Sequence, residues 1–310
     1  MKGLINLGST CFISSILQII FNLKHFKEKF DTEESNSEFK TLYHHYNSDE
    51  LTVSPDILKR FIISTNLFQG YQGDQHEFFS GLMNIIHEAH HRKCDLKKLK
   101  IFSYYEPDDM VQKAYTAFHL NGLTIDSDMN LKGKSYGYVS PIIDVFTGQL
   151  AAGTICVCGS ITNNFEIFRT VELSLTKQTT TLTECLDEFT NLEHIENYSC
   201  DACGKYQNAA RRFTFWHLPP VISFTLKRSN HLAQKNNSVL QTPEILDMTP
   251  YLTRNTMGTK YELVAIAHHT GHVNFGHCFS TIKKMDGSWR VLNDQQVTIL
   301  PNRVDSPTDY

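Results

Sequence analysis

The chain has 310 residues, enough for one large domain or two ordinary ones, and its 41% hydrophobic and 20% charged residues are usual for a soluble globular protein. Its 29 basic and 33 acidic residues give a net charge of -4, so direct binding of nucleic acid is not predicted. No apolar run reaches the roughly 18 residues of a membrane helix. Polar residues interrupt the apolar N-terminal stretch, so we predict no secretory signal and no membrane partner.

The first half of the chain has mainly helical patterns. Residues 3–10 read as a glycine-containing loop, and Ser9 or Thr10 is placed to cap a helix over 11–23. Further helical patterns occur near residues 36–46, 55–64 and 74–91. Residues 100–140 are irregular and polar and predict no element.

From about residue 142 the patterns become those of β-strands. A helix is predicted at 182–190 and a loop at 229–238. The expected strands are 142–146, 172–175, 212–216, 221–227, 262–268, 278–282 and 289–292. A helical part followed by mostly antiparallel strands predicts an α+β fold.

Cys11 is a candidate nucleophile because it stands where a loop becomes a helix. The partial positive charge and free N–H groups of a helix N-terminus stabilise a thiolate. The alternative is a buried structural cysteine, which is the commoner role of a single cysteine.

His277 is the candidate base, because a Cys–His pair needs a histidine and a third group that orients its ring. His277 follows Gly276 just before a predicted strand, and Asn293 and Asp294 end a later strand. Each feature alone is weak, since the chain has 15 histidines.

Five segments, in order along the chain, together resemble the sequence boxes of the ubiquitin-specific proteases. They cover nearly the whole chain from residue 3 to residue 297. The segments are 3–18 (GLINLGSTCFISSILQ), 72–78 (QGDQHEF), 218–228 (LPPVISFTLKR), 269–277 (HTGHVNFGH) and 289–297 (WRVLNDQQV).

This resemblance implies a papain-like cysteine protease shaped like a hand, with a helical thumb, a palm of antiparallel sheet and β-fingers. The expected organisation is a single catalytic domain over 1–310, with the thumb and an irregular insertion in about 1–140 and the fingers and palm in 141–310. By matched position, Cys11 attacks the isopeptide bond that joins ubiquitin to a lysine, His277 is its base and Asn293 orients His277. No catalytic cofactor is implied.

Two further residues have roles implied by the resemblance. Asn6 matches the side chain that donates to the oxyanion of the tetrahedral intermediate, a role that a positioned amide can fill; the alternative is a simple turn residue. Asp294 is the neighbouring candidate for a supporting role. The chain departs from the family pattern at Ser9, where asparagine is usual, and at Cys278, where a tyrosine often follows the catalytic histidine.

Four cysteines form two short motifs that fit a metal. Cys200 and Cys203 form a Cys-x-x-Cys motif, and Cys156 and Cys158 form a shorter Cys-x-Cys motif. Four thiolates from two such turns make a structural, fully ligated zinc site, and many members of the resembled family carry zinc at the tips of the fingers. The alternative is a lost site whose cysteines pack as small apolar groups.

A rival motif is His-Glu-x-x-His at residues 87–91, which is typical of zinc metalloproteases. His87 and His91 would share one helix face, and Glu88 could act as base. No nearby spacing supplies a third ligand, so the favoured interpretation is a solvated, histidine-rich helix end.

Residues 180–190 (TTLTECLDEFT) and 246–251 (LDMTPY) resemble the SAGA-associated histone deubiquitinase within that family. The implied partners are ubiquitin, ubiquitinated histone H2B and the SAGA adaptor proteins, in the nucleus, with the cytoplasm as an alternative. A general deubiquitinase without SAGA partners and a catalytically silent ubiquitin-binding module are the other hypotheses.

Overall fold

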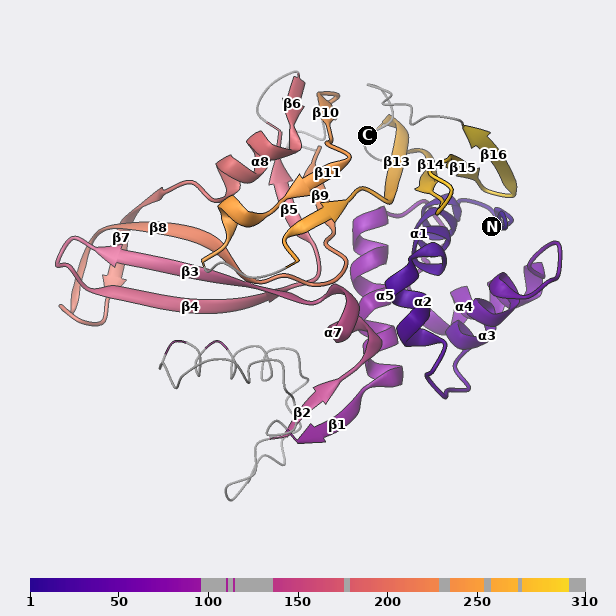
Figure 1. The fold of residues 1–310 in the computed structure, drawn as a ribbon, viewed down its shortest axis with the longest axis horizontal. Helices are drawn as coiled ribbons and strands as arrows, with labels where there is room; N and C mark the ends of the chain where they lie inside the picture. The colour runs from indigo at the N-terminus through magenta and orange to yellow at the C-terminus, as the bar shows by residue number, and fades with distance from the viewer. Residues whose placement is uncertain are drawn as a thin grey trace.

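The computed structural model describes residues 1–95, 110, 114, 136–175, 179–228, 235–253, 258–272 and 275–300. Most of the irregular segment at 100–140 and most of the predicted loop at 229–238 lie outside these residues. The described residues form a helical part and several mostly antiparallel sheets, which confirms the predicted α+β fold (Figure 1).

The helical part contains the helices predicted in the first half of the chain and two that were not predicted. Helix α2 and helix α7 are the additions. The elements are α1 (Cys11–Asn22), α2 (Lys24–Phe30), α3 (Glu38–Asn47), α4 (Pro55–Thr65), α5 (Gln75–His90) and α7 (Pro141–Phe146).

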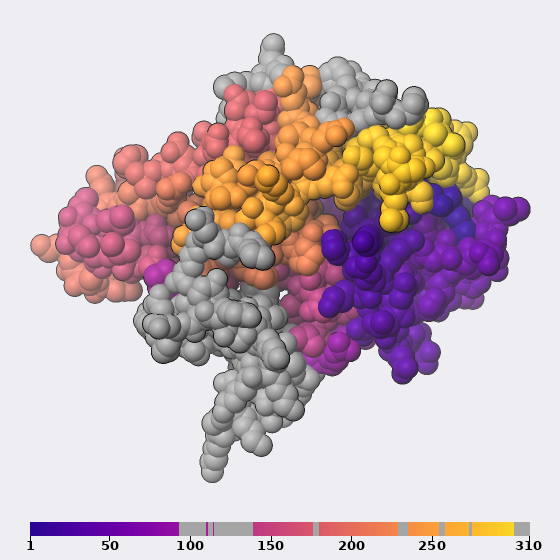
Figure 2. All heavy atoms as spheres, in the orientation of Figure 1, coloured from indigo at the N-terminus to yellow at the C-terminus, as the bar shows by residue number. Residues whose placement is uncertain are grey.

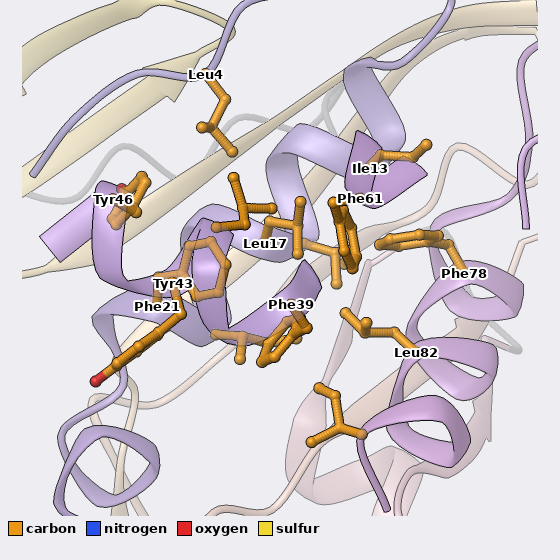
Figure 3. Packing of buried hydrophobic residues seen from close by; sticks show 14 of the residues in the cluster. Leu4, Ile13, Leu17, Phe21, Phe39, Tyr43, Tyr46, Phe61, Phe78 and Leu82 are labelled. Carbon is orange, nitrogen blue, oxygen red and sulfur yellow. The ribbon is translucent and has the colours of Figure 1, made fainter. Parts of the chain in front are cut away.

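Helix α1 lies in the centre of this part and is buried on nearly every side. Its apolar residues Ile13, Leu17, Ile20 and Phe21 are 0% exposed, and even its polar residue Gln18 is 0% exposed. Figure 3 shows residues of α3, α4 and α5 packed around it. Because densely packed cores resist displacement, α1 gives the residue at its N-terminus, Cys11, a rigid support.

The strand predicted at 142–146 is wrong, because these residues form helix α7. Pro141 occupies the first turn, where proline is tolerated, and the Ser140 side chain accepts a hydrogen bond from the backbone N–H of Ile143 at 3.3 Å. The buried residues Ile142, Val145 and Phe146 join the core of the helical part. A short apolar run does not distinguish a buried strand from a buried helix.

A long antiparallel sheet extends away from the helices in Figure 1. Its strand order is β4 (Ile161–Phe168), β3 (Gly148–Cys156), β8 (Lys205–His217) and β7 (Glu193–Cys200). Of these strands, the sequence predicted only the part of β8 at 212–216. This sheet corresponds to the fingers.

A second antiparallel sheet packs on α1 and corresponds to the palm. Its strand order is β13 (Ala265–His272), β14 (Phe275–Lys283), β15 (Trp289–Asn293) and β16 (Gln296–Leu300). Strand β14 makes the most extensive contact with α1, and β13 and β15 also contact it. Figure 2 shows the C-terminal strands, in yellow, lying directly against the N-terminal helical part, in indigo.

Smaller pairs of strands, helix α8 (Leu182–Phe189) and the short 3-10 helix η3 (Thr249–Tyr251) complete the described structure. Helix α8 and its neighbours form a second apolar core. The pairs are β1 (Arg92–Asp95) with β2 (Tyr136–Val139), β5 (Val171–Ser174) with β9 (Phe224–Lys227), β6 (Thr179–Thr181) with β10 (Val239–Gln241), and β11 (Ile245–Asp247) with β12 (Lys260–Glu262). A membrane crossing would need a longer and more apolar helix than any in the described part of the chain.

Candidate active site

A sharp turn brings the chain to Cys11. Gly8 and Ser9 both have positive φ angles, of 96° and 53°, and Thr10 is the N-cap residue of α1. The predicted side-chain cap is wrong, because the Thr10 hydroxyl accepts a hydrogen bond from the N–H of Leu7 at 2.9 Å and none from the helix. The first-turn N–H groups of α1 therefore have no side-chain cap and remain suited to stabilise an anion at Cys11.

The palm sheet places His277 and Asn293 beside Cys11. His277 lies on β14 and Asn293 on β15, and Nε2 of His277 lies 2.5 Å from Oδ1 of Asn293. The imidazole also forms a side-chain hydrogen bond with Cys11. If the Nε2 proton is donated to Asn293, Nδ1 is the nitrogen that faces the sulfur, which is the arrangement a thiol–imidazole pair needs.

The pKa of Cys11 is lowered to about 6. The largest cause is the hydrogen bond from the Cys278 side chain; burial opposes it, and the Cys278 backbone N–H and the His277 charge add to the lowering. Burial also disfavours the imidazolium of His277, but the hydrogen bond to Asn293 and the charges of Cys11 and Asp294 outweigh it and raise the pKa of His277. The two shifts therefore favour the thiolate form of Cys11 and the imidazolium form of His277 in the same pair.

The lowered pKa predicts how Cys11 reacts with iodoacetamide as pH changes. Only the thiolate reacts, so the alkylation rate of Cys11 should rise with pH to a midpoint near about 6. Cys278→Ala should move this midpoint upward, because it removes the hydrogen bond with the largest effect. The measurement is the rate of Cys11 labelling by peptide mass spectrometry from pH 5 to pH 9. A midpoint at the ordinary thiol value of about 8.5 would contradict the assignment.

Asn6 is held by its own loop so that its amide N–H groups face outward. Its Oδ1 accepts hydrogen bonds from the backbone N–H groups of Gly8 at 3.0 Å and Thr10 at 3.2 Å. Its Nδ2 donates to Oδ2 of Asp294 at 3.2 Å. The donor end is therefore fixed and exposed five residues before Cys11, as the oxyanion role requires.

Asp294 joins the palm to the N-terminal segment. It turns the chain after β15 with a φ of 51°, and its carbonyl accepts hydrogen bonds from the N–H of Leu4 and from Nε2 of Gln18, both at 2.9 Å. A Cβ at Gly3 would lie 2.2 Å from the carbonyl oxygen of Gln295, so only glycine permits this approach. The residue next to Asn293 is thus fixed to α1.

Gln72 lies in the second sequence box but is not among the predicted site residues. Its Oε1 accepts a hydrogen bond from the N–H of Gly276 at 3.0 Å, and its side chain also hydrogen-bonds Cys278. Both partners flank His277. Gln72 therefore connects the chain just before α5 to the strand that bears the candidate base.

The four cysteines of the two short motifs meet at one end of the finger sheet. The sulfur atoms of Cys156, Cys158, Cys200 and Cys203 all lie within 4.8 Å of one another, and those of Cys158 and Cys200 are 3.8 Å apart. Four sulfurs bound about 2.3 Å from one zinc ion lie about 3.8 Å apart at the corners of a tetrahedron. The cluster therefore could hold a metal ion.

The shorter motif does not prevent this arrangement, because both motifs end in similar turns. The N–H of Gly159 donates to the carbonyl of Cys156 and the N–H of Gly204 donates to that of Cys200, each at 2.8 Å. Both glycines have positive φ, of 87° and 65°. Two glycine turns at strand ends thus present the four thiols to a common centre.

The amino-acid sequence of the chain matches a known protein family over nearly its whole length. The sequence profile of the ubiquitin carboxyl-terminal hydrolases matches residues 2–310. The chain belongs to this family. Among known structures, the yeast SAGA DUB module Ubp8/Sgf11/Sus1/Sgf73 bound to monoubiquitin contains a chain that is 25% identical, with a TM-score of 0.72 over 97% of this chain and 65% of that one. The fold is that of a ubiquitin-specific protease catalytic domain.

Curated relatives of this chain include ubiquitin carboxyl-terminal hydrolase nonstop of Drosophila melanogaster, 28% identical over 96% of this chain and 64% of that protein. Ubiquitin carboxyl-terminal hydrolase 8 of Saccharomyces cerevisiae is 27% identical over 96% of this chain and 66% of that protein. The chain therefore spans slightly less than two thirds of the length of these relatives.

The His-Glu-x-x-His motif lies at the end of α5 and is partly buried, not solvated as predicted. His87 is 6% exposed and its Nδ1 lies 2.8 Å from the hydroxyl of Ser140, the residue that caps α7. Nδ1 of His91 lies 2.9 Å from the carbonyl of Glu88. Within the described residues, the finger cysteines are the only group gathered closely enough to hold a metal.

We expect Glu88→Gln to leave isopeptidase activity within about twofold of the wild-type value, since exposed substitutions away from a site change little. The measurement is turnover of a ubiquitin–lysine isopeptide substrate, with circular dichroism as the check on folding. A folded but inactive Glu88→Gln protein would instead support metalloprotease chemistry at this helix end.

Proposed function

We propose that this protein is a deubiquitinating cysteine protease that hydrolyses the isopeptide bond between the ubiquitin C-terminus and a substrate lysine. The observation that carries the proposal is the cluster of Cys11, His277 and Asn293, with the Asn6 amide beside it, in a chain of this family. A thiolate, a base oriented by a third side chain and an amide donor are the groups that acyl transfer needs.

In the first half of the reaction, the Cys11 thiolate attacks the carbonyl carbon of the isopeptide bond. The negative charge that develops on the carbonyl oxygen is stabilised by the Asn6 amide and the uncapped first turn of α1. The imidazolium of His277 protonates the departing lysine amine, and Asn293 keeps the ring in place. Ubiquitin is then joined to Cys11 as a thioester.

In the second half, the neutral His277 removes a proton from a water molecule that attacks the thioester. The thiolate of Cys11 leaves, and ubiquitin is released with a free carboxylate. The hydrogen bond from the Cys278 side chain favours this departure, because it stabilises the thiolate form of Cys11. No step needs a metal or an organic cofactor.

The proposal is tested by incubating the protein with ubiquitin joined to a lysine side chain and measuring released ubiquitin. Release that is lost in His277→Ala supports it. Ubiquitin binding by the wild-type protein without release would instead identify a silent ubiquitin-binding module.

We further propose that Cys156, Cys158, Cys200 and Cys203 hold one structural zinc ion. The sulfur spacing and the four-thiol donor set support it. Gln207 donates from Nε2 to the sulfur of Cys203 at 2.8 Å, a contact that would stabilise a zinc-bound thiolate. Because four ligands saturate a tetrahedral ion, the metal would fix the end of the finger sheet and have no open position for chemistry.

The zinc proposal predicts about one equivalent of zinc in the purified protein. Cys200→Ser should lose the metal and lower the melting temperature, since binding energy at structural zinc sites contributes directly to folding. Cys185→Ser is the matched control, because Cys185 is a buried thiol on α8 that faces the second apolar core. A folded, active wild-type protein that contains no metal would contradict the proposal.

We also propose that the substrate is monoubiquitinated histone H2B, acted on in the nucleus within a SAGA-like module. The similarity to the yeast SAGA DUB module supports this proposal. In addition, the two segments on which the SAGA resemblance rests contact each other: the Tyr251 hydroxyl donates to Oδ1 of Asp187 at 3.1 Å and to the carbonyl of Thr183 at 3.3 Å.

A dependence on adaptors follows from the position of the candidate residues. Asn293 is the last residue of β15 and His277 the third residue of β14, so both lie at the loop ends of the palm sheet. Loops are mobile unless something packs on them, and a bound adaptor would favour the competent arrangement.

The test is turnover of nucleosomes monoubiquitinated on H2B, with and without the homologues of Sgf11, Sus1 and Sgf73 from the same organism. We expect weak activity alone and higher activity with adaptors. Full activity alone, no adaptor binding and no preference for histone-linked ubiquitin would leave a general deubiquitinase.

A further inference from the structure

A buried amide on α1 lies on the same face of the helix as Cys11. Gln18 follows Cys11 by seven residues, which is close to two turns of an α-helix, so the two side chains project in nearly the same direction. Gln18 is 0% exposed, although glutamine is usually found on protein surfaces. Burying a polar group costs free energy, so its place in the centre of an apolar core calls for a physical reason.

One end of the Gln18 amide has a hydrogen-bond partner and the other end has none. Nε2 donates to the carbonyl oxygen of Asp294 at 2.9 Å. Because a carbonyl can only accept, the NH2 group must be the end that faces Asp294. Oε1 has no hydrogen-bond partner among the residues that the structure describes. A buried acceptor without a partner is destabilising, so stability alone does not account for a glutamine at this position.

The partner of Gln18 lies in the turn that follows Asn293. Strand β15 ends at Asn293 and β16 begins at Gln296, so Asp294 and Gln295 form a two-residue turn. Asp294 has a φ of 51°, a left-handed conformation that is uncommon outside glycine and persists where its surroundings hold it. In so short a turn, a shift of Asp294 is transmitted directly to Asn293.

The same turn fixes two residues of the candidate site. The Oδ2 atom of Asp294 accepts a hydrogen bond from Nδ2 of Asn6 at 3.2 Å. Oδ1 of Asn293 lies 2.5 Å from Nε2 of His277. The oxyanion candidate and the residue that orients the base therefore both depend on where Asp294 lies, and Gln18 connects Asp294 to the helix that begins at the nucleophile.

We propose that Gln18 is a positioning residue for the reaction, whose buried amide fixes the Asn293–Asp294 turn relative to Cys11. The proposal deepens the proposed function and rests on it where turnover is the readout. Gln18 acts through Asp294 and contacts neither the substrate nor the reacting atoms. A displacement of about 1 Å in a catalytic group can lower a rate by about 10²-fold, so a small movement of this turn is enough to affect turnover.

The first variant, Gln18→Met, keeps the length of the side chain and removes the donor. We expect kcat for a ubiquitin–lysine isopeptide substrate to fall by roughly 10- to 10²-fold, with a smaller change in KM. The melting temperature should stay at or above the wild-type value, because an apolar side chain replaces an amide with one unpaired end. A residue with only a structural role would show the reverse, a lower melting temperature with wild-type kcat in the folded protein.

Ser14→Ala is the matched control for Gln18→Met. Ser14 lies on the same face of α1 and is 1% exposed, and its hydroxyl has no hydrogen-bond partner within the described part of the chain. Its kcat should therefore stay within about twofold of the wild-type value. An equal loss of kcat in Ser14→Ala and Gln18→Met would overturn the proposal, as would a kcat within about twofold of wild type in Gln18→Met.

A second variant, Gln18→Glu, separates the hydrogen bond from the packing of the side chain. A neutral carboxyl group can donate to the carbonyl of Asp294, whereas an ionised one has no proton to donate. Burial disfavours the charged form, so this variant should be most active at low pH. We expect its kcat, divided by that of the wild type, to be higher at about pH 6 than at about pH 8.5. A ratio that is equally low at both pH values would contradict the role of the hydrogen bond.

A readout without ubiquitin separates this proposal from the proposed function. If the turn moves, Asn293 no longer holds the ring of His277 in place, and the pH midpoint of Cys11 alkylation by iodoacetamide should rise. We expect this rise in Gln18→Met and not in Ser14→Ala. If the wild type fails to cleave ubiquitin, the proposed function is refuted and the midpoint alone decides. A rise in Gln18→Met then supports the positioning role, and an unchanged midpoint overturns it.

Discussion

Cys11→Ala is expected to abolish both turnover and covalent capture by a ubiquitin that carries a C-terminal electrophile. The variant keeps the helix and the palm sheet but has no sulfur to attack a carbonyl or an electrophile. Wild-type protein should gain the mass of one ubiquitin, linked to the Cys11 peptide. The measurement is intact mass followed by peptide mapping, so a single reaction examines the nucleophile, the fold and the substrate class together.

Two controls make this result specific to Cys11. Cys185→Ala removes another buried thiol and should still form the adduct. The Cys11→Ala protein should still bind unmodified ubiquitin, because the rest of the site is intact. An adduct at any other cysteine, with Cys11 unmodified, would contradict the assignment.

Asn6→Ala is expected to slow turnover by roughly 10²–10³, the usual effect of removing one oxyanion donor. The loss should appear in kcat more than in KM, because the oxyanion exists only in the transition state and intermediate. The measurement is steady-state hydrolysis of a ubiquitin–lysine isopeptide substrate.

Asn6→Ala also removes the loop hydrogen bonds to Gly8 and Thr10, so a second variant must separate the two effects. Asn6→Asp keeps an oxygen that can accept these bonds but has no donor, and it places a carboxylate against that of Asp294. A loss as large as in Asn6→Ala would assign the effect to the donor. Activity near wild type in Asn6→Asp would show that Asn6 is a turn residue only.

Local patterns predicted the elements that bear the candidate site. The helical spacing after Cys11 predicted α1, and alternation near 278–282 and 289–292 predicted the strands that bear His277 and Asn293. These predictions succeeded because amphipathic periodicity and short β-rich runs are properties of adjacent residues.

Patterns failed where the local signal was weak or ambiguous. The run at 142–146 is apolar at nearly every position, and only its capping by Ser140 and burial in the helical core make it a helix. Strand β4, by contrast, has a polar run at 162–164 in its first half, and its pairing with β3 decides its conformation. Thr10 has a side chain that could cap the helix. Its hydroxyl instead accepts a hydrogen bond from the N–H of Leu7 and donates one to Oδ1 of Asn6, both in the preceding loop.

The sequence by itself determined the α+β class, the residue types available for thiol chemistry and the two cysteine motifs, because these depend on composition, order and spacing. Only the tertiary structure decided that Gln72 connects to the histidine strand and that Asp294 joins the palm to α1. These contacts join residues that are 204 or more positions apart, and no periodicity in the chain encodes them. They exist because burying α1 against the palm sheet brings the first and last boxes of the sequence together.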